Sequence, residues 1–179
     1  MFHGSMATCK GLDTLLDAFK IVRSKSSKYK LIIAGAGEES KRIAKRVTSE
    51  QIKGVIFTGW YDHQKLEEIM KKTDISIVMR SGNFANNFIV TTCLLENWCY
   101  MKPVLVPNLA SFKQNVKKSV SGIFFEPDNP SSLDKKMFYL ADNPNIWSTL
   151  GKNGQKKANQ KFNHKKIAIK LSKIISNGK

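Results

Sequence analysis

Residues 29–39 read YKLIIAGAGEE, an apolar run that ends in two closely spaced glycines and continues into charged residues. The run is predicted to be a buried strand, and residues 38–48 the helix that follows it. Similar apolar runs stand at 54–58, 74–79, 103–107 and 120–125. Strands without polar alternation are typical of a parallel sheet that is covered by helices on both faces.

Amphipathic segments separate these strands. After Gly11, the residues Leu12, Leu15, Leu16 and Phe19 follow helical spacing. Further helices are predicted at 64–73 and 89–100, and the chain beyond Pro130 is predicted to be helical, with a last helix at about 164–176. We therefore expect one α/β domain over residues 1–179, with a Rossmann-like parallel sheet. Such sheets bind ligands beyond the carboxyl ends of their strands, here the loops after residues 4, 34, 58, 80 and 107.

Composition excludes several classes of protein. A hydrophobic fraction of 41% over 179 residues is enough for a buried core and excludes disorder as the main state. The chain contains no apolar run of the ~20 residues that a membrane-spanning helix needs, and its first residues do not resemble a signal peptide. Three separated cysteines favour a reduced, cytoplasmic setting. The histidines and cysteines show no metal-ligand spacing, so we expect no metal.

The net charge of +16 is compatible with nucleic acid, an anionic membrane surface or a phosphorylated substrate. The lysines occur in pairs along predicted helices, without the interleaved aromatic residues that single-strand binders use. We expect solvated helix faces and no nucleic-acid partner. A peripheral contact with the anionic inner face of a membrane stays open.

The turn Gly35-Ala36-Gly37 lies where a strand leads into a helix, a position at which backbone N–H groups can hold phosphate. Ser40 stands where a dinucleotide fingerprint has its third glycine. The carboxylates of Glu38 and Glu39 also oppose an anion at this helix start. A tight turn without a ligand is an equally good interpretation.

Seven segments, in this order and spacing, carry a resemblance to a known family. They are Gly4 with KGLDTLLDAF (10–19), YKLIIAGAGEE (29–39), VIFTGW (55–60), LEEIMKKTDISI (66–77), LLENWCYMKPVLV (94–106), GIFFEP (122–127) and FNHKKI (162–167). The chain resembles the C-terminal, donor-binding domain of a family 4 (group 1) glycosyltransferase of the GT-B architecture. The resemblance implies a nucleotide sugar such as a UDP- or GDP-sugar as donor, no other cofactor, and an N-terminal acceptor-binding half or separate subunit.

The resemblance also implies a site for the donor phosphates. The family has Gly-Arg, four residues, then Lys-Gly; Lys10 matches the lysine, but Ser5 stands in the arginine's place. The backbone of Phe88, Ile89 and Val90, at the start of the predicted apolar helix, is expected to donate N–H bonds to phosphate. The alternative for Lys10 is a solvated lysine at a helix start.

The family carries a pair of glutamates separated by seven residues. Glu96 matches the second, which the resemblance assigns to the ribose hydroxyls, since a carboxylate accepts two hydrogen bonds at once. Phe88 stands in place of the first, which contacts the donor sugar. Asn86 and Asn87 lie beside it and are candidate sugar-binding residues, with an ordinary polar loop as the alternative.

Tyr61 and Asp62 lie where the family contacts the nucleotide base. Trp60 fits either a stack on the base or a cap on the core, and we favour the core. No catalytic residue is assigned.

The resemblance thus predicts a hexosyltransferase-like domain that transfers sugar with retention, inactive without its other half. The alternative is a non-catalytic nucleotide-sugar-binding subunit, because Ser5 and Phe88 depart from the family pattern.

Overall fold

The computed structural model describes residues 1–89 and 91–177 and contains six parallel strands in two sets of three. In one set β2 lies between β1 and β3, and in the other β5 lies between β4 and β6. The strands are β1 (Phe2–His3), β2 (Leu31–Ala34), β3 (Val55–Gly59), β4 (Ser76–Ile77), β5 (Val104–Pro107) and β6 (Ile123–Phe125).

Hydrogen bonds at Met1 join the two sets into one sheet. The Ile77 N–H donates to the Met1 carbonyl at 2.8 Å, and the Met1 amine donates to the Ile75 carbonyl at 2.7 Å. The strand order is therefore β3-β2-β1-β4-β5-β6. All strands are parallel, but successive strands are added toward one edge up to β3 and toward the other edge from β4 on, so the strand order reverses between β1 and β4. The α/β sheet with parallel strands that the sequence predicts is confirmed.

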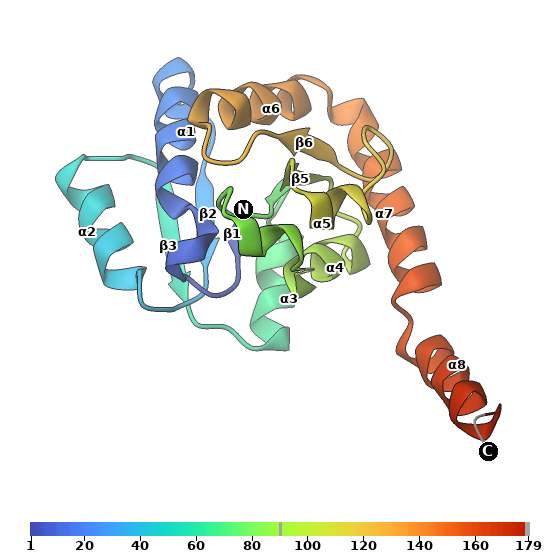
Figure 1. Cartoon of the computed structure of the whole chain (residues 1–179). Helices are drawn as coiled ribbons and strands as arrows, with labels where there is room; N and C mark the ends of the chain where they lie inside the picture. The colour runs from blue at the N-terminus through green and yellow to red at the C-terminus, as the bar shows by residue number, and fades with distance from the viewer. Residues whose placement is uncertain (90, 178–179) are drawn as a thin grey trace.

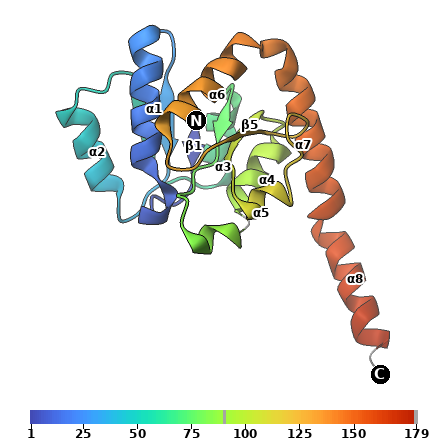
Figure 2. The same ribbon diagram turned by 45° about the horizontal axis from the view of Figure 1, so that its top comes forward.

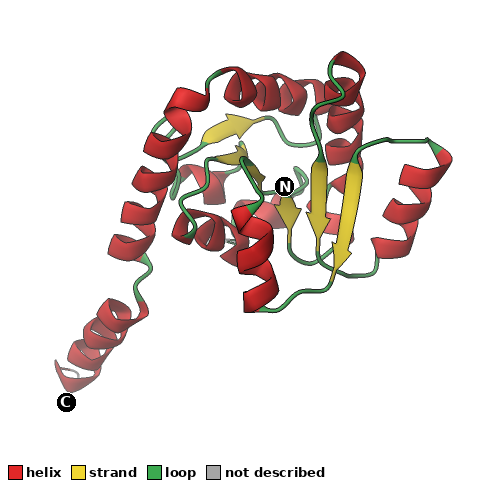
Figure 3. Cartoon of the chain, turned by 180° about the vertical axis from the view of Figure 1, so that it is seen from behind, coloured by secondary structure: helices red, strands yellow, loops and turns green. Residues whose placement is uncertain are grey.

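Helices cover both faces of this sheet: α1 lies in front of it in Figure 1, and α3 lies in front of it in the reverse view of Figure 3. The α-helices are α1 (Leu12–Lys25), α2 (Ser40–Ser49), α3 (His63–Lys71), α4 (Thr92–Cys99), α5 (Ala110–Lys113), α6 (Pro130–Asp142), α7 (Trp147–Lys161) and α8 (His164–Asn177). Short 3₁₀ turns are η1 (Thr8–Lys10), η2 (Phe84–Asn87) and η3 (Pro144–Ile146).

The prediction that a helix begins at Ile89 is wrong, since α4 begins at Thr92. The residues before it form the separate turn η2, because the Asn83 side chain accepts a hydrogen bond from the Asn86 N–H at 3.0 Å and caps that turn. Asparagine favours such local caps over a continuing helix. The first turn of α4, and the N–H groups it exposes, therefore lie further along the chain than the sequence indicated.

Close packing against α7 fixes the position of α4. Trp98 is fully buried, and its indole N–H donates to the Ser121 carbonyl at 2.9 Å. A Cβ atom at Gly154 would lie 2.1 Å from the Trp98 ring, so only glycine lets the two helices approach this closely.

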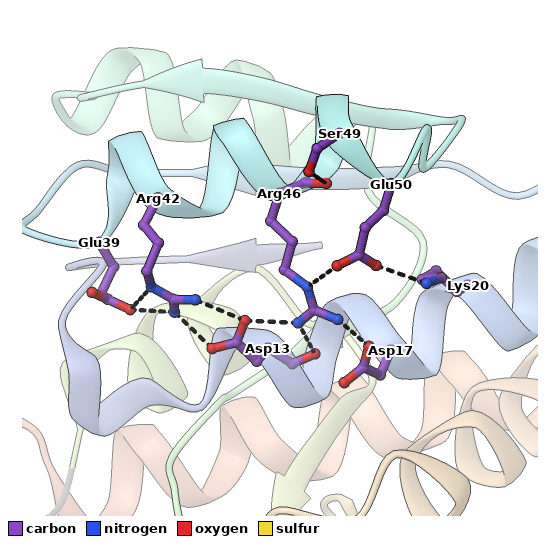
Figure 4. Close-up of polar contacts among 8 residues, drawn as sticks. All are labelled: Asp13, Asp17, Lys20, Glu39, Arg42, Arg46, Ser49 and Glu50. Carbon is purple, nitrogen blue, oxygen red and sulfur yellow. Dashed lines mark hydrogen bonds and ion pairs between the residues drawn. The ribbon is translucent and has the colours of Figure 1, made fainter.

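An ion-pair network holds α2 against α1 (Figure 4). Arg42 contacts Asp13 at 2.6 Å and also binds Glu39. Arg46 contacts Asp13 and Glu50, each at 2.7 Å, and also binds Asp17. These acidic groups lie next to several cations, so the network fixes the start of α1, directly after Lys10 and Gly11, against the neighbouring helix.

The last helix, α8, points away from the body of the domain (Figures 1 and 2). Its apolar side chains are between 51% and 64% exposed, and its charged residues are all lysines. The exposed apolar residues are Ile167, Ile169, Leu171, Ile174 and Ile175. Among the described residues, no helix is long and apolar enough to span a membrane.

The loop after β2 packs directly on the loop after β1. Gly4 donates its N–H to the Ala34 carbonyl at 3.0 Å, and a Cβ at Gly35 would lie 1.9 Å from the Gly4 carbonyl oxygen. Gly35 also has a φ of +136°, a conformation that side-chain-bearing residues rarely adopt. These glycines therefore allow a close approach of backbones, which favours the tight-turn interpretation.

Replacing Gly35 by alanine should lower the free energy of unfolding by roughly 2–4 kcal/mol, because both overpacking and backbone strain oppose it. The matched control is Gly59→Ala. Gly59 also has a positive φ, of +71°, but its added Cβ meets nothing within 4 Å, so the control should lose only about 1 kcal/mol. Urea unfolding measures both, and equal losses would contradict the close-approach account.

Candidate functional site

The site lies beyond the carboxyl ends of β1 and β4, where the strand order reverses. Lys10 ends the turn η1 and is only 7% exposed. The turn is held on both sides: the Glu38 carboxylate accepts hydrogen bonds from the Thr8 N–H and hydroxyl at 3.0 and 2.8 Å, and the Ser81 N–H donates to the Cys9 carbonyl at 3.0 Å. Lys10 is thus placed by the fold and is not a solvated surface lysine.

Arg80, directly after β4, lies close to Lys10. Burial, together with the positive charge of Arg80, lowers the pKa of the Lys10 ammonium group. Within residues 1–89 and 91–177, neither side chain forms an ion pair with a carboxylate. Two adjacent cations without an acidic partner make the site electropositive and suited to an anion.

The N-terminal end of α4 adds to this character. Thr91 is the N-cap residue, but its side chain makes no capping bond, and its buried hydroxyl has no partner. The first N–H groups of a helix have no partner within the helix and carry partial positive charge. In this structure they belong to Thr92 and Cys93, the first two residues of α4.

The residues predicted for phosphate are placed differently from one another. Ser5 is exposed in the loop after β1. The Phe88 N–H donates to the Ala85 carbonyl at 3.1 Å, and the Phe88 side chain is 72% exposed. Ile89 is exposed, and Val90 lies outside the described residues. Of the predicted phosphate ligands that the structure describes, Lys10 is the one in a buried, electropositive position.

The two asparagines that were predicted to bind the sugar form hydrogen bonds with other residues of the protein. Asn86 is 1% exposed, and its amide donates to the Ser81 carbonyl at 2.9 Å and to the Cys9 carbonyl at 3.2 Å. The Asn87 amide oxygen accepts from the Ala110 N–H at 3.1 Å. Asn86 therefore ties the loop after β4 to the turn that carries Lys10.

Glu96 lies on α4, with its side chain about one third exposed. Burial raises the pKa of its carboxyl group. Its nearest basic group is the His3 Nδ1 atom at 3.7 Å, which is beyond hydrogen-bond distance. No other described residue donates a side-chain hydrogen bond to it, so this carboxylate is free to accept bonds from a ligand.

The buried side chain of His3 lies next to Glu96. Its Nε2 atom lies 3.2 Å from the Asn97 amide oxygen, and its Nδ1 atom lies 3.1 Å from the Tyr61 hydroxyl. Burial lowers the pKa of His3 to about 4, so the ring is neutral at pH 7. Burial likewise raises the pKa of the Tyr61 hydroxyl, which remains protonated.

The other predicted base-binding residue, Asp62, caps α3, because its carboxylate accepts from the Lys65 N–H at 2.8 Å. Trp60 beside it is 76% exposed, so our preference for a core role was wrong. Phe84 is 80% exposed and packs edge-on against Phe88, with ring centroids 5.2 Å apart. Exposed aromatic rings therefore lie on the loops after β3 and β4.

The fold brings His3 next to Cys93 and Glu96, and all three side chains are of types that can bind a metal. Atoms of His3, Cys93 and Glu96 all lie within 4.8 Å of one another. Nitrogen, sulfur and oxygen donors of this kind suit a zinc ion. Sequence spacing could not find this cluster, because His3 lies about ninety residues from the other two.

A cavity lies elsewhere, away from these residues. It has a volume of about 730 Å³ and lies at the amino ends of the strands, lined by residues such as Met1, Leu31, Ile75, Phe138 and Trp147. Its lining is mainly apolar and contains none of the predicted site residues.

The sequence model of the family "Glycosyl transferases group 1" matches residues 1–157. The chain belongs to the group 1 glycosyltransferase family, and the resemblance stated from the sequence is confirmed.

Relatives in sequence include an uncharacterized glycosyltransferase, MJ1069, of Methanocaldococcus jannaschii, which is 25% identical over 97% of this chain and 44% of its own length. The D-rhamnosyltransferase WbpZ of Pseudomonas aeruginosa is 23% identical over 90% of this chain and 41% of its own length. The chain spans less than half the length of these curated relatives.

Solved structures share the fold. HepE of Anabaena in complex with UDP matches with a TM-score of 0.84 and 18% identity over 98% of this chain and 48% of its own. The C-terminal domain of LpcC, a group 1 glycosyltransferase of Francisella tularensis, matches with a TM-score of 0.73 and 15% identity over 90% of this chain and 84% of its own. The second match is to a domain that was solved by itself.

The neutral state of His3 should make stability depend on pH. The pKa of the group is about 4 when folded and about 6.5 when unfolded, so the unfolded chain binds more protons between these values. The free energy of unfolding should therefore fall by about 2 kcal/mol from pH 7 to pH 5 on account of His3. Urea unfolding at the two pH values measures this loss.

The comparison needs His3→Gln, because the buried Met1 amine, with its pKa lowered to about 5, adds a slope of the same sign. The variant should show a smaller loss by that amount, whereas His164→Gln, at an exposed position, should behave as the wild type. An unchanged slope in His3→Gln would contradict a buried, neutral His3.

Proposed function

We propose that this chain is the nucleotide-sugar-binding domain of a retaining, hexosyltransferase-like glycosyltransferase. The observation that carries the proposal is the buried Lys10, which forms no ion pair with a carboxylate among the described residues and lies near Cys93 in the first turn of α4. A lysine and helix N–H groups of this kind stabilise the negative charge that develops on a departing nucleoside diphosphate. The UDP and UDP-glucose complexes of the HepE structures, which share this fold, support a ligand of that class.

Glu96 would bind the ribose of the same ligand. Its half-buried carboxylate lacks a hydrogen-bond donor among the described residues, and two hydroxyls of a vicinal diol satisfy both of its oxygens. Next to Glu96, the neutral ring of His3 is held in place by hydrogen bonds with the Tyr61 hydroxyl and the Asn97 amide oxygen. The exposed Trp60 ring, on the loop after β3, offers a stacking surface for a base.

The acceptor would be presented by an N-terminal half or a separate subunit, since the curated relatives are more than twice the length that this chain matches. The apolar side chains of α8 and the rings of Phe84 and Phe88 are exposed. Their exposure supports a partner surface that covers them. The lysines of α8, with no acidic residue among them, also support a peripheral contact with an anionic membrane at the cytoplasmic face.

Two variants should separate the phosphate and ribose roles. Lys10→Met should weaken binding of UDP or GDP by about 1.5–3 kcal/mol while leaving the nucleoside unaffected, because it removes a contact to phosphate alone. Glu96→Gln should weaken the nucleoside and the diphosphate alike, because both carry the ribose. Calorimetry with whichever diphosphate raises the thermal midpoint most measures these affinities.

The matched control is Lys41→Met, which removes the same charge from an exposed position on α2 and should leave both affinities unchanged. A Lys10→Met variant that weakens nucleoside and diphosphate equally would contradict the phosphate role. Full affinity in Glu96→Gln would contradict the ribose role.

A non-catalytic nucleotide-sugar-binding subunit is the second candidate, and the absence of any acidic residue between positions 80 and 95 favours it. The chain by itself should bind a donor and transfer no sugar, because one domain cannot orient an acceptor or exclude water. Product analysis by mass spectrometry, with and without an N-terminal half of a related enzyme, distinguishes the candidates. Turnover by the chain alone would contradict the half-enzyme account.

A further inference from the structure

Arg80 is a charged side chain that forms no ion pair with a carboxylate among the described residues. It follows β4 at the edge of the electropositive site, and it is only partly exposed. Its Nη1 atom lies 3.3 Å from the Cys9 sulfur and 3.4 Å from the Asn86 amide oxygen, and neither acceptor is a carboxylate. Its Nε atom is buried and has no hydrogen-bond partner among the residues that the structure describes.

This placement is unfavourable for the protein without a ligand. A guanidinium has five N–H donors, and a buried donor without a partner destabilises the folded state. Lys10, another cation close by, adds like-charge repulsion, and the charge of Arg80 accordingly contributes to lowering the Lys10 pKa. Both effects lower the stability of the protein without a ligand. A bound anion would offset both, because it would accept hydrogen bonds from Arg80 and neutralise the two positive charges.

The topology brings the two cations together where the strand order reverses. Lys10 follows β1 and Arg80 follows β4, and these strands are neighbours at the point where the strand order reverses. The loops after such strands diverge and leave an opening for a ligand. The buried, unpartnered Thr91 hydroxyl and the start of α4 lie on the same segment as the proposed phosphate ligands.

We propose that Arg80 is the second cation that binds the donor diphosphate, opposite Lys10. The proposal rests on the proposed function and adds to it a residue that neither the family pattern nor the sequence motifs indicated. A diphosphate in a nucleotide sugar carries two negative charges, so Lys10 and Arg80 together would neutralise it. The planar guanidinium would in addition bind two phosphate oxygens at once, which a lysine cannot do.

Asn86 would then be a positioning residue for Arg80. Its amide oxygen accepts from Arg80, while its amide nitrogen donates to the Ser81 and Cys9 carbonyls. These bonds link the loop after β4 to the turn that carries Lys10 and so set the spacing between the two cations. Ser5, which is neutral and exposed, supplies no charge from the loop after β1, so the second cation comes from the neighbouring strand.

The experiment compares wild type, Arg80→Gln, Arg80→Lys and Lys41→Gln by calorimetry with a nucleoside, its monophosphate and its diphosphate. Uridine, UMP and UDP are the first set, and the guanosine compounds are the second. Arg80→Gln should weaken diphosphate binding roughly 10–100-fold and leave nucleoside binding unchanged. Arg80→Lys should fall between it and wild type, and Lys41→Gln should match wild type.

The thermal midpoint of unfolding distinguishes the proposed role from a purely structural one, because loss of a purely structural Arg80 would lower it. Because Arg80 lacks an acidic partner and repels Lys10, the thermal midpoint of unliganded Arg80→Gln should equal or exceed that of wild type. A lowered midpoint, or diphosphate affinity within twofold of wild type in both Arg80 variants, would overturn the proposal. A wild type that binds the diphosphate no more tightly than the nucleoside would instead contradict the proposed function itself.

Discussion

The site depends on the hydrogen bonds that place β4 beside β1. Through them, Met1 joins two three-stranded sets into a sheet whose strand order reverses at its centre. Crossover connections on the two sides of this point run to opposite faces, so the loops that follow β1 and β4 separate. Lys10 therefore lies near Arg80 and the start of α4, which follow it by 70 residues or more in the sequence.

The distribution of acidic residues explains why the positive charges of Lys10 and Arg80 are not neutralised. The chain has 14 acidic residues against 30 basic ones, and many of the acidic groups already have partners. Asp13, Asp17, Glu39 and Glu50 bind the arginines of α2 (Figure 4). The Asp62 carboxylate caps a helix, so much of the negative charge lies where it stabilises helices rather than where it would neutralise Lys10.

Local sequence predicted the sheet and the family, because buried parallel strands appear as apolar runs and the family segments occur in order. It did not predict where α4 begins, since Ile89 fits a helical pattern and only the capping bond from Asn83 shows that a separate turn precedes the helix. It also placed Trp60 in the core, because an aromatic residue beside a strand has the same signature whether it is buried or exposed. The roles of His3, Asn86 and Arg80 depend on contacts between distant segments, which no motif records.

The most direct measurement of the central claim is a crystal structure of this chain with a nucleoside diphosphate that calorimetry has shown to bind. We expect the diphosphate beyond the carboxyl ends of β1 and β4, with its oxygens bonded to Lys10, to Arg80 and to the first N–H groups of α4, and with the ribose on Glu96. A diphosphate bound at the Gly35–Gly37 turn, or in the apolar cavity at the amino ends of the strands, would contradict the account.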